Sequence, residues 1–325
     1  MGSSVGQRLN RHERHVWEIV STSPLGSLWN LQGIPVRVVA KRTWKSVAED
    51  RIFGHAAELG FYFLFALFPT LFCASSILGL AARSAFKIYD KLLDYLALVI
   101  PTSALGTVLD TFNETTAAAS SGKVTFGLIA AIWSASAGIS AIQDTLNAVY
   151  KVEETRSYFR ARIYAIGLTI LLTVIISLAL GCMFGGDFIA GLAQRWIHDR
   201  SLYTAAGSAA RVLGWLLAAL FLALSFAVIY YWAPDIRARR WHWLTPGGAV
   251  GIVGWVAASL GLRVYLHFFN NYSVTYGSLG AVIILLTWFY LTGLMLLVGA
   301  EINSEIEAAA AEARVSGTST APQSV

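Results

Sequence analysis

Long apolar stretches, separated by short charged segments, run along most of the chain. The clearest lies between Arg263 and Glu301, where no Asp, Glu, Lys or Arg occurs. A helix needs roughly 20 apolar residues to cross about 30 Å of hydrocarbon, so this stretch is too long for one crossing. Polar residues interrupt it at Asn270 and Asn271. The pattern therefore predicts two membrane helices joined by a short hairpin.

Six stretches have the length and apolar character of membrane-spanning helices. They cover residues 59–82, 124–150, 163–184, 212–232, 244–268 and 275–300. In hydrocarbon every backbone polar group must be bonded within the protein, which a helix achieves within a single segment. We therefore predict an all-α, polytopic membrane protein with six transmembrane helices.

Two segments outside these crossings are predicted to form amphipathic helices, so that both membrane surfaces carry such elements. In residues 36–47, Val36, Val39 and Trp44 fall on one helical face, whereas Lys41 and Lys45 fall on another. This pattern is typical of a helix at the headgroup boundary, and a helix packed beneath the bundle would share it. Residues 84–122 contain two apolar faces separated by a proline, and we interpret them as an external helical cap.

These segments divide the chain into three predicted regions. Residues 1–57 form an N-terminal segment with one amphipathic helix, and residues 58–307 form the membrane domain, which includes the cap at 84–122. Residues 308–325 are expected to form a disordered tail, because Ser, Thr, Gly, Pro and Gln dominate its end and leave little apolar surface to bury.

The composition supports a membrane protein and accounts for its positive charge. Of the 325 residues, 56% are hydrophobic and 13% are charged, and the net charge is +5. Basic residues gather in the N-terminal segment and in the short loops at 151–162 and 237–240, which lie on one side in this topology. Short loops rich in Lys and Arg face the cytoplasm, so both termini are predicted to be cytoplasmic. The positive charge therefore does not indicate nucleic-acid binding.

Polar side chains within the predicted crossings are the candidate functional residues, because polar groups in hydrocarbon are costly. In the second crossing Ser136, Gln143 and Asn147 follow one another at helical spacing on one face. They either hold neighbouring helices together or line a polar cavity. Pro69 removes a backbone hydrogen bond within the first crossing, which predicts a kink. Arg263 lies within the fifth crossing, and its side chain either anchors the helix at the outer surface or contacts an anionic substrate.

Several short motifs stand out in and beside the crossings. The longest is Tyr-Ser-Val-Thr-Tyr-Gly-Ser-Leu-Gly-Ala at 272–281, which is followed by Gly-Ala-Glu-Ile-Asn at 299–303. Earlier motifs are Phe-Ala-Leu-Phe-Pro at 65–69, Trp-Ser-Ala-Ser-Ala-Gly at 133–138 and Ala-Pro-Asp at 233–235. Together, over residues 56–307, they resemble the YihY/virulence factor BrkB family of bacterial inner-membrane proteins.

This resemblance implies a six-helix protein of the bacterial inner membrane, in a family linked to envelope integrity and lipid export. The family has also been labelled a tRNA-processing ribonuclease. The sequence argues against that chemistry, because metal-dependent phosphodiesterases need clustered His and Asp ligands. The six histidines are scattered over the chain, and no Walker-type phosphate loop occurs. We therefore expect a protein that is not an enzyme and that needs no metal or cofactor.

The leading hypothesis is a transporter or flippase that moves an anionic lipid or amphiphile between the leaflets. Its partners would be anionic membrane lipids rather than nucleic acid, and the alternative is a scaffold for envelope assembly that transports nothing. In the transport hypothesis Arg263 attracts the headgroup, and Glu301 with Asn303 guards the inner mouth. The proposed pathway consists of Pro69, Ser136, Gln143, Asn147, Arg263, Tyr276, Gly277, Ser278, Glu301 and Asn303.

Reporter fusions test the predicted topology. A reporter that is active only outside the cytoplasm should give signal when it is fused after Asn271, because that hairpin is predicted to face outward. The same reporter fused after Arg240 should be silent. The opposite pair of results would show that the protein has the reverse orientation in the membrane.

Overall fold

The structure is a computed structural model that describes residues 11–22, 28–29, 35–80, 121–196, 199–238, 240–268 and 278–319. Two shorter helices, α1 (Arg11–Thr22) and α2 (Val36–Glu49), precede the long ones. The long helices are α3 (Ile52–Leu80), α6 (Ser121–Val149), α7 (Tyr158–Trp196), α8 (Arg200–Trp232), α9 (Pro246–Phe268) and α11 (Ser278–Ser319). Each of these contains a stretch long and apolar enough to cross a membrane. The predicted all-α architecture with six membrane helices is confirmed.

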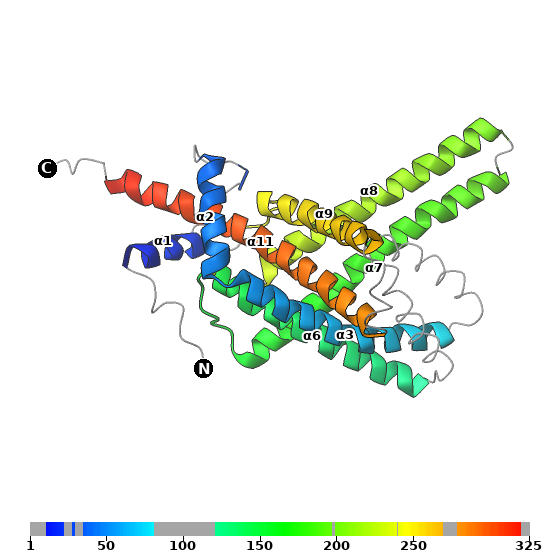
Figure 1. The fold of residues 1–325 in the computed structure, drawn as a ribbon, viewed down its shortest axis with the longest axis horizontal. Coiled ribbons are helices and arrows are strands. Elements are labelled where there is room, and N and C mark those ends of the chain that lie inside the picture. The colour runs from blue at the N-terminus through cyan, green and yellow to red at the C-terminus, as the bar shows by residue number, and fades with distance from the viewer. Residues whose placement is uncertain are drawn as a thin grey trace.

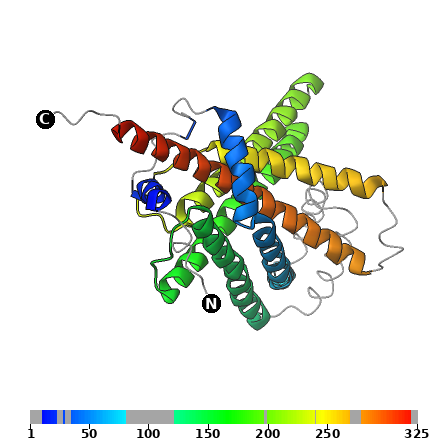
Figure 2. The ribbon, with the colours of Figure 1, turned by 60° about the vertical axis from the view of Figure 1, so that its left-hand side comes forward.

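Helix α11 lies at the centre of the bundle. It packs against α1, α2, α3, α6 and α9. Helices α7 and α8 pair with each other and rise at an angle to α11 (Figure 1). In Figure 2, α3, α6, α9 and α11 come together near α2 and spread apart toward their other ends. We call the end where they come together the α2 end.

The most deeply buried core of the bundle lies at the α2 end. Leu59 of α3, Leu146 of α6 and Leu297 of α11 are each 0% exposed. Farther along α3, by contrast, Phe65 is 57% exposed. An exposed apolar face of this kind is what a helix presents to lipid, whereas the α2 end is held by side-chain packing between helices.

Glycines allow the backbones of α9 and α11 to approach closely. A Cβ atom on Gly247 would collide with the carbonyl oxygen of Gly299, and one on Gly251 would lie 3.0 Å from the carbonyl oxygen of Met295. Small residues at such positions are typical of tightly packed membrane helices. A Cβ on Gly261, in contrast, would meet nothing within 4 Å. The close contact is therefore confined to the first part of α9.

Helices α7 and α8 extend well past the crossings predicted at 163–184 and 212–232. Helix α8 begins at Arg200 because the side chain of Asp199 accepts hydrogen bonds from the backbone nitrogens of Ser201 and Leu202, at 2.8 and 3.3 Å. The two helices approach closely where a Cβ on Gly214 would lie 2.6 Å from the carbonyl oxygen of Cys182. With 39 residues, α7 is about 60 Å long.

The ends of the chain are more helical than predicted. Helix α11 continues to Ser319, and residues 308–311 are buried, so the disordered tail predicted at 308–325 is wrong for residues 308–319. Four consecutive alanines there let other elements pack closely, and α1 and α2 both contact α11. Helix α1 was not predicted within residues 1–57. The cap predicted at 84–122 lies outside the described residues, apart from 121 and 122, which begin α6.

The amphipathic helix predicted at 36–47 is present as α2, and it packs on α11. Its buried residues are Val39, Thr43 and Val47, which share one face. Arg42 pairs with Glu312 at 2.6 Å, and the hydroxyl of Ser46 donates to Glu305 at 2.6 Å. Trp44 is 76% exposed. One face of α2 is therefore bound to the bundle while another stays open.

Substitution of two glycines on α9 tests the close contact with α11. We expect Gly247→Ala to lower the free energy of unfolding by about 1–3 kcal/mol, because the added methyl group forces the helices apart. The matched change Gly261→Ala adds its methyl group to open space and should be neutral or stabilising, since alanine favours a helix by roughly 0.5–1 kcal/mol over glycine. Thermal unfolding of the two variants in one detergent measures the difference. Equal changes in stability for the two variants would contradict a close contact between α9 and α11 at Gly247.

Candidate functional site

The polar face predicted on the second crossing is buried in α6. Ser136 is 0%, Gln143 2% and Asn147 5% exposed. The hydroxyl of Ser136 donates to the carbonyl oxygen of Trp133 in the same helix, at 2.8 Å. The Nε2 atom of Gln143 has no hydrogen-bond partner within the part of the chain that the structure describes. Neither the hydroxyl of Ser136 nor the Nε2 atom of Gln143 therefore donates a hydrogen bond to another described helix.

An arginine from the next helix reaches the same region of α6. The guanidinium of Arg162 in α7 lies 4.4 Å from the ring centre of Trp133. It donates to the hydroxyl of Ser140 at 3.2 Å and to the carbonyl oxygen of Trp133 at 3.1 Å. A cation over an indole face is stabilising, most of all away from water. Sequence patterns identified Arg162 only as a basic loop residue, because its contacts are set by the packing of α7 on α6.

Asn147 joins three segments at the α2 end. Its Nδ2 atom donates to Glu154 at 2.9 Å, and its Oδ1 atom accepts from the backbone nitrogen of Asp235 at 2.7 Å. Asp235 also accepts from the backbone nitrogen and the hydroxyl of Thr155, at 2.8 and 2.5 Å. Arg156 lies between the two acids, at 2.6 Å from Glu154 and 3.7 Å from Asp235. The loop after α6 and the segment after α8 are thereby held together.

Asn303 has a similar role at the start of α9. Its Oδ1 atom accepts from the backbone nitrogen of Gly247 at 2.9 Å, and its Nδ2 atom donates to the hydroxyl of Thr245 at 2.9 Å. The same hydroxyl accepts from the backbone nitrogen of Gly248 at 2.9 Å. Unpaired backbone N–H groups at a helix start need such acceptors. Asn303, 1% exposed, therefore fixes the first turn of α9 on α11.

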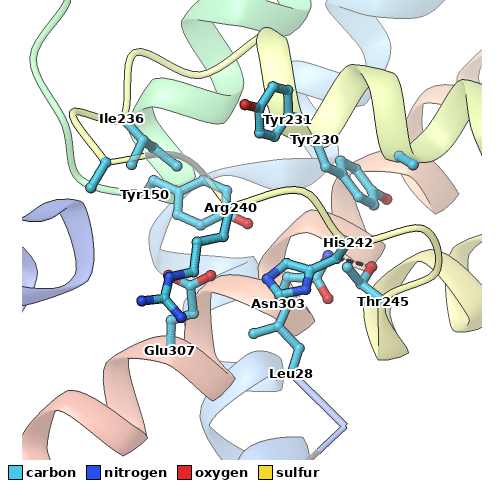
Figure 3. Close-up of a pocket in the computed structure, with 12 residues that line it drawn as sticks. Leu28, Tyr150, Tyr230, Tyr231, Ile236, Arg240, His242, Thr245, Asn303 and Glu307 are labelled. Carbon is cyan, nitrogen blue, oxygen red and sulfur yellow. Dashed lines mark hydrogen bonds between the residues drawn. The ribbon is translucent and has the colours of Figure 1, made fainter. Parts of the chain in front are cut away.

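A small cavity of about 50 Å³ lies between these elements at the α2 end (Figure 3). Asn303 is the only predicted pathway residue among those that line it. Figure 3 shows the side chains of Arg240 and Glu307 pointing toward one another at its edge. A polar cavity of this size can hold a few water molecules, but not a lipid. The other lining residues include Leu28, Tyr150, Tyr230, His242 and Thr245.

Glu301 is the most deeply buried acid at this end, at 1% exposed. Neither of its carboxyl oxygens has a hydrogen-bond donor within reach among the described residues. It interacts with Asp50, which ends α2, and with Lys151, which follows α6. Lys151 pairs with Asp50 through its ammonium group. Burial raises the pKa of Asp50, and Lys151 offsets only part of that rise. Sequence patterns did not identify Asp50, and they identified Lys151 only as a basic loop residue that orients the crossings.

A much larger space lies outside the bundle, beside α2. This apolar groove has a volume of about 750 Å³ and is bounded by α2, α3, α9 and α11. Thr43 is its polar member, and Trp44, Phe53 and Val250 are exposed along it. The other lining residues are Trp29, Val36, Val39, Ala40, Val47, Pro246, Leu294, Met295, Val298, Ile302 and Ile306.

The remaining predicted pathway residues do not join these features. Arg263 is exposed on α9, and it lies about 140° round that helix from Val250, so it does not extend the groove. Pro69 is half-buried within α3, well away from the α2 end. Ser278 begins α11, while Tyr276 and Gly277 lie outside the described residues. The structure thus brings Asn147, Glu301 and Asn303 to one end of the bundle and leaves Arg263 and Pro69 apart.

Comparisons with known proteins agree on a family of membrane proteins. The profile of a family described as Virulence factor BrkB matches residues 43–324. YfkH of Bacillus subtilis (strain 168), named a ribonuclease-like protein, is 34% identical over 77% of this chain and 88% of its own length. A UPF0761 membrane protein of Stenotrophomonas maltophilia (strain R551-3) is 27% identical over 82% of this chain, which spans 60% of that relative. No solved structure matches the chain.

Within the described residues, no group of three or more His, Cys, Asp or Glu side chains is arranged to hold a metal ion. Some of the acids at the α2 end are paired with basic side chains, as Asp50 is with Lys151 and Glu154 is with Arg156.

Replacement of Asn147 tests its role at the α2 end. We expect Asn147→Ala to lower the free energy of unfolding by about 1–3 kcal/mol, because it leaves the backbone N–H of Asp235 without its acceptor and removes one of the donors to Glu154. Ser136→Ala is the matched control and should cost less than about 1 kcal/mol, since that hydroxyl bonds only within its own helix. Thermal unfolding in detergent compares the two. A larger loss for Ser136→Ala would contradict this assignment.

Proposed function

The chain belongs to the virulence factor BrkB family of membrane proteins, and we propose that it binds an anionic lipid or amphiphile beside α2 and moves it between the leaflets. The observation that carries this proposal is the apolar groove of about 750 Å³ bounded by α2, α3, α9 and α11. In the proposal the protein lies in a bacterial inner membrane with the α2 end and both termini at the cytoplasmic face.

The groove suits an acyl chain. Its lining is apolar apart from Thr43, and binding sites for apolar ligands commonly enclose 300–1,000 Å³ in this way. Exposed apolar residues such as Trp44 and Val250 make its entrance continuous with the lipid-facing surface of the helices. A tail could therefore enter from the bilayer without leaving an apolar environment.

A row of basic residues on α2 supports an anionic headgroup. Arg37, Lys41 and Lys45 are exposed. Each follows a groove-lining residue by one position, which places the row about 100° round the helix from Val36, Ala40 and Trp44. Near an anionic membrane surface each Lys or Arg contributes about 1 kcal/mol to attraction. The headgroup would lie on this basic row while the tail occupies the groove.

The route in this proposal runs along the surface of the bundle rather than through its centre. Leu59, Leu146 and Leu297 close the middle of the α2 end, and the cavity there measures only about 50 Å³. The headgroup would therefore pass beside the helices with its tails in the bilayer. No Walker-type nucleotide site occurs in the sequence, so a gradient or a partner protein would supply the energy.

A non-transporting scaffold is the second candidate. The observation in its favour is the C-terminal part of α11, which extends beyond the bundle and carries α1 and α2 on its sides (Figure 1). Such a projecting helix could present a surface to a partner protein. The ribonuclease-like name of YfkH is a statement about that protein, and we propose no nuclease activity for this chain.

Leaflet exchange in liposomes tests the transport proposal. We expect the purified protein to accelerate exchange of a fluorescent phosphatidylglycerol, measured by chemical quenching of the outer leaflet. The double variant Arg37→Gln/Lys41→Gln should slow this exchange by about tenfold, because it removes two charges from the basic row. Lys45 is left in place because it pairs with Glu49 at 3.4 Å.

Two matched controls separate the groove from general surface effects. Arg160→Gln/Arg237→Gln removes two exposed charges that do not adjoin the groove, and it should exchange lipid at the wild-type rate. Val250→Trp should block the groove, whereas Val253→Trp adds the same bulk to an exposed position of α9 that does not line it. Absence of exchange by the wild-type protein would favour the scaffold, and equal rates in both charge variants would remove the basic row from the proposal.

A further inference from the structure

Two acids and one amine meet where α2, α6 and α11 come together. Asp50 follows the last residue of α2, Lys151 follows α6, and Glu301 lies on α11. The side chains of Asp50 and Lys151 are 12% and 15% exposed, and Glu301 is 1% exposed. The site is therefore almost closed to water and is open only on the side of Asp50 and Lys151.

The hydrogen bonds of this site are incomplete. Lys151 donates to the Oδ1 atom of Asp50. The Oδ2 atom of Asp50 and both carboxyl oxygens of Glu301 have no donor among the residues that the structure describes. The two carboxyl groups interact with each other. Because neither carboxylate can donate without a proton, a hydrogen bond between them requires that one be protonated.

The surrounding charges do not supply a second cation. Glu305 also acts on Glu301, Glu49 acts on Asp50, and Glu301 acts on the buried phenol of Tyr150. Glu305 accepts from Ser46, and the nearby Arg42 forms an ion pair with Glu312. Lys151 is thus the one cation shared by Asp50 and Glu301 among the described residues. A second buried carboxylate would carry an uncompensated charge, which costs several kcal/mol.

We infer that Asp50, Glu301 and Lys151 form a proton-binding site in which the two carboxyl groups share one proton. The proton bridges Glu301 and the Oδ2 atom of Asp50, while Lys151 neutralises the single remaining negative charge. Exchange with the aqueous side takes place through Asp50, the more exposed of the two acids. No oxidation or bond exchange beyond this proton transfer is involved.

The position of the site connects its proton to the packing of three elements. Loss of the proton places two negative charges between α11 and the corner that joins α2 to α3. That corner turns at Arg51, and the neighbouring loop turns at Lys151, with φ values of 55° and 52°. Non-glycine residues rarely adopt this conformation, so surrounding contacts must hold it. Deprotonation weakens those contacts and loosens the end of α2.

Infrared spectroscopy of the full-length protein tests the proton directly. At neutral pH we expect the carbonyl band of a buried protonated carboxylic acid, which shifts in deuterated water and disappears on strong alkalinisation. Glu301→Gln should abolish the band. Asp50→Asn should also abolish it, because the remaining acid then ionises opposite Lys151. Lys151→Met should roughly double the band, since both acids then need a proton.

A control variant and a check that each variant folds are needed to interpret the infrared band. Glu312→Gln alters a partly exposed acid that is paired with Arg42, and it should leave the band unchanged. Glu301→Gln has nearly the shape of the protonated acid, so it should remain monodisperse in detergent. If Asp50→Asn fails to fold, Lys151→Met decides the charge balance. The inference would be overturned if the wild-type protein showed no such band or if Glu301→Gln kept the full band. It would also be overturned if the band disappeared when sodium was added at constant pH, because sodium rather than a proton would then neutralise the second carboxylate.

Discussion

The close approach of the α9 and α11 backbones at Gly247 and Gly299 determines the shape of the cavity and of the apolar groove at the α2 end. A Cβ on Gly299 would collide with the hydroxyl of Tyr230, and that hydroxyl donates to the carbonyl oxygen of Leu296 at 2.7 Å. Asn303 can reach the first turn of α9 only because the backbones lie so close. The small cavity and one wall of the apolar groove both depend on this contact. Glycine in α9 is thus required by geometry rather than by flexibility.

Polar and apolar functions are separated at this end of the bundle. The acids and amides lie inside, where hydrogen bonds and ion pairs join the segments after α2, α6 and α8 to one another, and Asn303 joins the segment before α9 to α11. The apolar groove lies outside, against the lipid-facing surface, and α2 belongs to both. Its Asp50 end joins the charged site, while Val36, Ala40 and Trp44 line the groove. A change in protonation at the inferred proton site would therefore act on a wall of the groove, because Asp50 directly follows α2 and α2 lines the groove.

The number of membrane helices could be predicted from the sequence, because hydropathy depends only on local composition. The burial of Glu301 and Asn303 could not be predicted, because polar residues at the end of an apolar helix commonly face water at the membrane surface, as the predicted inner mouth requires. The partners of Asn147 could not be predicted either, since Asp235 is distant in the sequence and meets it only through the fold. Helical spacing likewise could not show that Ser136 bonds its own helix, or that Arg263 faces outward from α9. The length of α8 was underestimated because Asp199 starts the helix before its apolar stretch begins.

The length of the α7–α8 pair has a consequence for the bilayer itself. Between Arg162 and Asp187, helix α7 has 24 consecutive uncharged residues, which make about 36 Å of helix. A hydrocarbon layer of about 30 Å accommodates such a stretch if the helix leans by about 35° or if the surrounding lipid deforms. An inclined pair disturbs the order of neighbouring tails. Next to this hairpin the bilayer would be a poorer barrier to polar groups than it is elsewhere.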